Sequence, residues 1–123
     1  MSSGYSALTV EAVRLALGAT AQRQRVIAHN IANVDSRDHV RAKVVFEEQL
    51  AQALDAARQV GARDAAALSG VRPETEPDLS LGKVQLDDEV VSLSANSVRY
   101  QALSRGITRY LSIAGLIASA TRG

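Results

Sequence analysis

The sequence predicts an all-α fold in which the N- and C-terminal helices pair as a coiled coil, with a short central helix and a flexible central loop between them. Near both ends of the chain, apolar residues recur at alternating spacings of three and four, which is the pattern of a helical seam. Glycine and proline gather in the middle of the chain. Only 3% of the residues are aromatic, so a deep core is poorly supplied and burial against partners is expected.

The first helix is predicted from Thr9 to about Asn33, with Thr9 as its N-cap residue. A second apolar stripe lies beside its seam and includes Ile27 and Ile31. Small residues on the seam let another helix approach closely. The seam itself comprises Leu8, Ala12, Leu15, Ala19, Gln22 and Val26.

A second, shorter helix is predicted from Phe46 to Val60, where apolar residues fall at helical spacing. The following stretch, Gly61 to Gly82, is rich in glycine and proline and poor in large apolar residues, so we expect a mobile loop. Two regions result. Residues 1–34 and 83–123 form the terminal helical coiled-coil domain, and residues 35–82 form the central region.

The final helix is predicted to begin near Asp87, where three consecutive acidic residues suit a helix N-terminus, and to run toward Arg122. Toward the C-terminus the apolar residues spread around the whole helix, which requires burial in something larger than this chain. We therefore expect the terminal helices to become fully ordered only on assembly. The seam comprises Leu86, Val90, Leu93, Tyr100, Ile107, Leu111, Ala114 and Ala118, is broken by Ser97 and Ser104, and is widened by Leu103, Tyr110, Ile113 and Ile117.

Neither the net charge nor the motifs of the chain indicate nucleic-acid binding, catalysis or metal binding. A net charge of +1, from 14 basic and 13 acidic residues, does not predict nucleic-acid binding. Cysteine is absent, and no G-x-S-x-G elbow occurs. His29 and His39 lie near Asp35 and Asp38, but their spacing matches no metal-ligand motif, and a structural or solvated role is preferred. We expect no enzymatic activity, no metal and no cofactor.

Neither a secretory signal nor a membrane span is predicted. The N-terminus lacks a positive region followed by a continuous apolar run. The most apolar window, Tyr110 to Ala120, is about half of the ~20 residues needed to cross a bilayer.

Two segments resemble the bacterial flagellar basal-body rod family. The segment from Gln24 to Asp35 contains Asn30, Ile31, Ala32 and Asn33, which match the Asn-Ile-Ala-Asn core of that family. The segments Val84–Glu89 and Ala95–Leu103 are similar to the FlgB branch, the proximal rod proteins. The chain departs from the family after Asp35, where Ser-Arg-Asp-His replaces the usual Thr-Pro-Gly-Tyr, so the turn there is expected to differ.

The resemblance implies a structural subunit that polymerises through its terminal helices, forms the axial tube of the rod and transmits torque. It also implies export through the flagellar type III apparatus and a place in the basal body, across the periplasm. The implied partners are other copies of the chain, other rod proteins, the adaptor FliE and the flagellar export gate. The expected assembly interface comprises Leu15, Ala19, Val26, Ile27, Ile31, Leu93, Tyr100, Leu103, Ile107 and Leu111.

Two alternatives stay open. A cytoplasmic helical chaperone or adaptor for type III secretion substrates would also expose apolar helix faces. The segment Arg99–Leu103 carries an arginine and a tyrosine, which are common in interface hot spots, but core packing explains it equally well.

Overall fold

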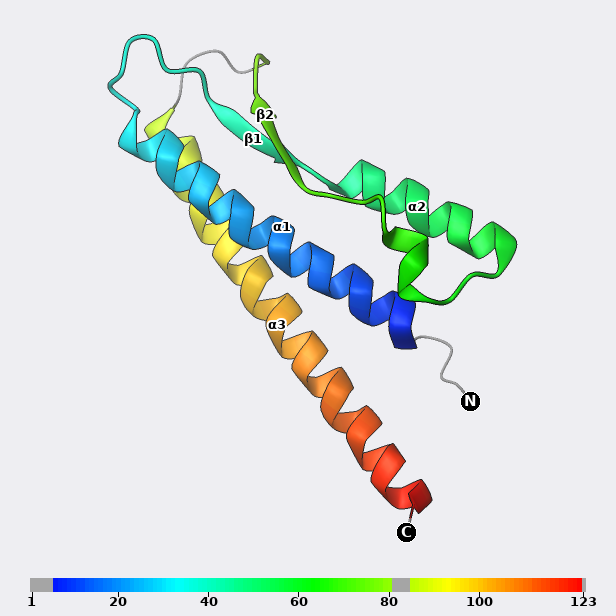
Figure 1. The fold of residues 1–123 in the computed structure, drawn as a ribbon. Coiled ribbons are helices and arrows are strands. Elements are labelled where there is room, and N and C mark those ends of the chain that lie inside the picture. The colour runs from blue at the N-terminus through cyan, green and yellow to red at the C-terminus, as the bar shows by residue number, and fades with distance from the viewer. Residues whose placement is uncertain (1–5, 81–84, 123) are drawn as a thin grey trace.

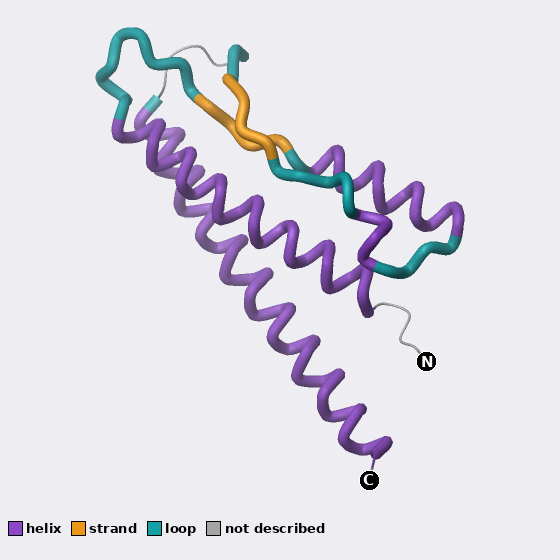
Figure 2. The backbone as a smooth tube through the Cα atoms, in the orientation of Figure 1, coloured by secondary structure: helices purple, strands orange, loops and turns teal. Residues whose placement is uncertain are grey.

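The computed structural model describes residues 6–80 and 85–122, and the chain is largely helical. In order, its elements are α1 (Ser6–Ala32), β1 (Ala42–Val45), α2 (Glu47–Val60), the 3-10 helix η1 (Ala65–Leu68), β2 (Glu74–Pro77) and α3 (Leu86–Arg122). The long helices α1 and α3 lie side by side and run in opposite directions (Figure 1). The central elements pack on another side of α1, where β1 and η1 contact it (Figure 2).

The three predicted helices are confirmed, with small changes at their ends. The prediction of Thr9 as an N-cap is wrong, because α1 already includes Ser6. Phe46 precedes α2 rather than belonging to it, and α3 begins one residue before Asp87. Gly61 ends α2 in the left-handed conformation, with φ of 70°, and the backbone N–H of Ala62 donates to the carbonyl of Ala57 at 2.9 Å. This is the conformation in which glycine commonly terminates a helix.

The all-α prediction is too coarse, because β1 and β2 form a two-stranded antiparallel sheet. Its register pairs Ala42 with Pro77 and Val45 with Glu74. The predicted loop from Gly61 to Gly82 contains η1 and β2, so it is structured in much of its described part; Gly82 and the predicted domain boundary at residue 83 lie outside the described residues. Each strand has only four residues, and all four of β2 are exposed, so neither carries a clear alternation of apolar and polar residues.

The hydrophobic core lies between α1 and the central region. Ala19 of α1, Phe46, Leu68 and Val71 form its buried centre. The first half of the predicted α1 seam packs against this cluster, together with α2 residues. This seam therefore serves the core of the single chain. The surrounding residues are Leu8, Ala12, Leu15, Ala16, Leu50, Ala53 and Leu54.

The last part of α3 extends past the start of α1 (Figure 1). Every residue from Leu111 to Thr121 is exposed. Contacts of Asn30 with Glu89 and of Asn96 with Thr20 set the antiparallel register, which places the first turn of α1 opposite the region around Tyr110. Beyond that point, no described residue of the chain covers α3.

Candidate functional site

The asparagines of the Asn-Ile-Ala-Asn motif form hydrogen bonds to the backbone at the end of α1 and at the start of β1. Asn30 is fully buried, and its side chain bonds both backbone groups of Ala42: Nδ2 donates to the carbonyl at 2.9 Å, and the Ala42 N–H donates to Oδ1 at 3.0 Å. Asn33 donates from Nδ2 to the carbonyl of His29 at 2.8 Å, which closes the last turn of α1. The motif therefore fixes the start of β1 against the end of α1.

A buried ion network joins the same place to α3. Arg41, just before β1, donates from Nε to Glu89 Oε2 and from Nη1 to Asp78 Oδ2 at 2.6 Å. The Glu89 side chain is 1% exposed and that of Asp78 is 7% exposed. Asn30 Nδ2 also donates to Glu89 Oε1 at 3.4 Å. One arginine thus ties the first turn of α3 to the segment after β2.

The neighbours of Asp78 stabilise its carboxylate. The Ser80 hydroxyl donates to Asp78 Oδ1 at 2.6 Å and the Ser80 backbone N–H donates to the same oxygen at 3.1 Å. The hydroxyl bond is the largest cause that lowers the pKa of Asp78, and Lys43 and Arg41 lower it further.

A second polar connection joins the middle of α1 to α3. Asn96 is 3% exposed, and its Nδ2 donates to the carbonyl of Thr20 at 2.8 Å and to Gln24 Oε1 at 2.6 Å. Its Oδ1 is buried and has no hydrogen-bond partner among the described residues. Glu89 and Asn96 thus place two buried polar side chains in the α1–α3 contact, where a coiled-coil seam carries apolar residues.

Arg23 connects α1 to the central region. Its guanidinium donates to both carboxylate oxygens of Glu47, at 2.5 and 2.6 Å, and to the carbonyl of Val44 at 3.0 Å. The hydrogen bonds from Arg23 lower the pKa of Glu47. Gln22 adds a bond to Thr75 Oγ1 of β2 at 2.8 Å. Through these contacts the small sheet is anchored to α1.

The predicted assembly-interface residues divide by exposure. Ala19 and Ile27, at 1% and 6% exposed, are already covered within the single chain. Tyr100 and Leu111, at 44% and 52%, remain open on α3. The other six residues are half-buried: Leu15, Val26, Ile31, Leu93, Leu103 and Ile107. Beyond Leu111, three large apolar residues of α3 are also exposed, Ile113, Leu116 and Ile117.

The residues around His39 are held by contacts within the chain. His39 Nε2 lies 3.3 Å from Asn30 Oδ1, and the ring packs edge to face against His29 with a centroid distance of 5.2 Å. Asp35 and Asp38 are exposed. Among the described residues, no group of three or more histidine, aspartate and glutamate side chains gathers as metal ligands would.

Sequence reasoning missed the polar contacts between α1 and α3. The available signal was weak: Asn96 precedes Ser97, which breaks the seam between Leu93 and Tyr100, and Glu89 is interpreted from the sequence as an acidic residue of the first helical turn. Neither the depth of their burial nor the pairing of Glu89 with Arg41, 48 residues earlier, has a local sequence signature.

No helix in the described part of the chain combines the length and the hydropathy that a membrane span requires. No protein-family model matches the chain, and no curated protein gives a significant match.

Proposed function

We propose that this chain is a structural subunit of the bacterial flagellar basal-body rod, closest to the proximal rod protein FlgB, which polymerises through its terminal helices into the axial tube. The observation that carries the proposal is the uncovered, apolar end of α3. Leu111, Ile113, Leu116 and Ile117 are 52%, 51%, 70% and 60% exposed on a helix that extends beyond the rest of the chain. An exposed apolar surface of this kind is typical of an interaction site.

The energetics favour assembly through many contacts. A fully buried Leu or Ile side chain contributes roughly 1.5–3 kcal/mol, so covering what remains exposed of these four contributes about 3–7 kcal/mol. That is less than the ~8 kcal/mol of a micromolar complex, before the cost of association is included. One such contact is weak, whereas a subunit held by several neighbours in a tube is stable.

Charge supports packing between different surfaces of neighbouring copies. After Glu89, α3 contains Arg99, Arg105, Arg109 and Arg122 and no acidic residue. Acidic residues lie on the central region, where α2 begins with Glu47 and Glu48. A heterologous contact between the end of α3 and the start of α2 in the next copy would be complementary in charge, and such contacts build open helical assemblies. In the assembled rod we propose that α1 and α3 form coiled-coil contacts with those of neighbouring subunits.

The Asn-Ile-Ala-Asn motif is the basis for proposing the rod family. Asn30 and Asn33 have defined structural roles at the end of α1, so on this proposal the match at these positions corresponds to the junction between helix and strand. On this proposal the chain is exported through the flagellar type III apparatus, and its partners are other copies, other rod proteins, FliE and the export gate.

The test uses paired substitutions in bacteria that express the chain from its own locus. Leu116→Asp with Ile117→Asp places two charges on the uncovered end of α3, where they leave the single chain's own contacts intact. Circular dichroism of the purified variant should match the wild type, while swimming and recovery of the chain with basal bodies are lost. Val60→Asp, at a similarly exposed apolar position (79%) at the far end of α2 from Glu47 and Glu48, is the control and should swim.

Normal swimming of the Leu116→Asp, Ile117→Asp variant would refute the proposed interface. A soluble complex between the chain and an exported client, with no chain in the basal body, would favour the chaperone or adaptor function.

A further inference from the structure

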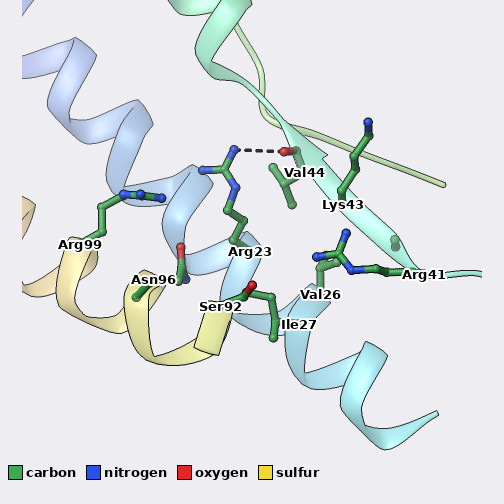
Figure 3. Close-up of a pocket in the computed structure, with 11 residues that line it drawn as sticks. Arg23, Val26, Ile27, Arg41, Lys43, Val44, Ser92, Asn96 and Arg99 are labelled. Carbon is green, nitrogen blue, oxygen red and sulfur yellow. Dashed lines mark hydrogen bonds between the residues drawn. The ribbon is translucent and has the colours of Figure 1, made fainter. Parts of the chain in front are cut away.

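A basic groove lies between β1, α1 and α3, away from the exposed end of α3. Four cationic side chains and no acidic one line this cavity of about 280 Å³ (Figure 3). Its walls are completed by apolar residues, of which Ile27 and Val44 are buried. The lining cations are Arg23, Arg41, Lys43 and Arg99.

The four cations are not equivalent. Arg23 is occupied by Glu47, and Arg41 by Glu89 and Asp78. Lys43 lies 4.0 Å from Glu76 and its ammonium points away from the groove (Figure 3). Arg99, which is exposed, forms no ion pair with any described residue. It is the lining guanidinium available to an incoming anion.

Asn96 adds a second unsatisfied group. The two hydrogen bonds of its Nδ2 fix the orientation of the amide, because turning it over would set Oδ1 against the carbonyl oxygen of Thr20. Oδ1 therefore stays without a donor, and it points to the side of the groove where Arg23 and Arg99 lie (Figure 3). A buried acceptor without a partner is costly, so a ligand that supplies an N–H is favoured.

We propose that this groove binds an acidic peptide segment of a partner protein. A carboxylate side chain of the segment pairs with Arg99, and a backbone N–H donates to Asn96 Oδ1. Arg99 is in no ion pair with a described residue, so its side chain can turn onto the carboxylate, and Oδ1 is reached when the lining side chains move apart to admit the segment. One planar guanidinium matches one carboxylate, whereas phosphate is better served by several free donors. The cavity is near the lower end of the ~300–1,000 Å³ range of ligand pockets, which suits one or two side chains of an extended segment.

The test is a titration of the full chain, labelled with ¹⁵N, with two blocked peptides. The probe is acetyl-Ala-Glu-Asp-Ala-amide, and its uncharged counterpart is acetyl-Ala-Gln-Asn-Ala-amide. The acidic peptide should give saturable shifts of the Asn96 side-chain amide and the Arg99 Nε–H signals, and the uncharged peptide should give none. Arg99→Gln should weaken binding about tenfold or more, as expected for loss of a hydrogen bond to a charged group.

Arg105→Gln removes the same charge from the same helix outside the groove and should leave the affinity unchanged. Equal binding of the uncharged peptide, or equal weakening by Arg99→Gln and Arg105→Gln, would overturn the proposal. Inorganic phosphate that saturates the same signals at lower concentration than the peptide would also overturn it and would identify a small-anion site. These readings use the isolated chain, so they are independent of whether it belongs to a rod.

Discussion

Replacing Arg41 by methionine should destabilise the chain far more than loss of an ordinary surface arginine. Arg41 is the common partner of Glu89 and Asp78, whose side chains are 1% and 7% exposed. The Arg41→Met variant retains the apolar stem but leaves the Glu89 carboxylate buried without its cation. Breaking a buried pair in this way costs about 3–5 kcal/mol, a large part of the roughly 5–15 kcal/mol that stabilises a typical domain.

Urea unfolding followed by circular dichroism measures this cost. The free energy of unfolding of a small protein falls by about 2 kcal/mol per molar urea, so the urea concentration at the unfolding midpoint should decrease by about 1.5–2.5 M. Adding Glu89→Gln should restore part of the loss, because the unpaired buried charge is then removed while Asn30 can still donate to the new amide oxygen. Arg14→Met, which breaks the exposed pair with Glu11, is the control and should leave the midpoint unchanged.

A cost below about 1 kcal/mol for Arg41→Met, which is the value of an exposed pair, would refute this reasoning. So would a double variant no more stable than Arg41→Met alone.

Three further predictions concern the hydrogen bonds of Asn30, the carboxylates of Asp78 and Glu47, and the backbone conformation of Gly61. Asn30→Ala leaves both backbone groups of Ala42 without their partner and should cost at least about 2 kcal/mol in urea unfolding; a neutral result would contradict the role given to the motif. Asp78 and Glu47 have lowered pKa values, so they bind fewer protons when folded than when unfolded, and the stability they contribute should be complete above about pH 5 and be lost progressively below it. In Asp78→Asn with Glu47→Gln, the difference between urea midpoints near neutral pH and near about pH 3 should shrink, and an unchanged difference would count against these two groups. Gly61→Ala, at φ of 70°, should lower the thermal midpoint, whereas Gly18→Ala, within α1 and with open space around it, should not.

The positions of the helices could be predicted from the sequence because each carries its own periodicity. The final helix was placed within one residue at its start, since three acids in sequence precede a persistent apolar stripe. The strands had no comparable signal. Val44 is buried because Arg23 and Phe46 bring β1 against α1, and β2 is a strand because Asp78 and Gln22 hold it beside β1. These are long-range contacts that a local pattern cannot encode.

The candidate site was predictable in part for the same reason. The exposed apolar end of α3 is a property of one segment. Its apolar residues spread around the whole helix, and this pattern indicates that the segment is buried against a partner. Asn30 was identified only as part of a motif, and its bonds to Ala42 explain why an asparagine, with a donor and an acceptor on one planar group, suits that position. The assignment of Ala19 and Ile27 to the assembly interface did not foresee that the chain's own residues cover them.

The most direct test of the account is mass spectrometry of purified flagellar basal bodies. The account predicts that peptides of this chain are recovered with the other rod proteins from wild-type cells and from cells carrying Val60→Asp. They should be missing from the basal bodies of cells carrying Leu116→Asp with Ile117→Asp. Absence of the chain from wild-type basal bodies, or its recovery there from the doubly substituted cells, would contradict the account.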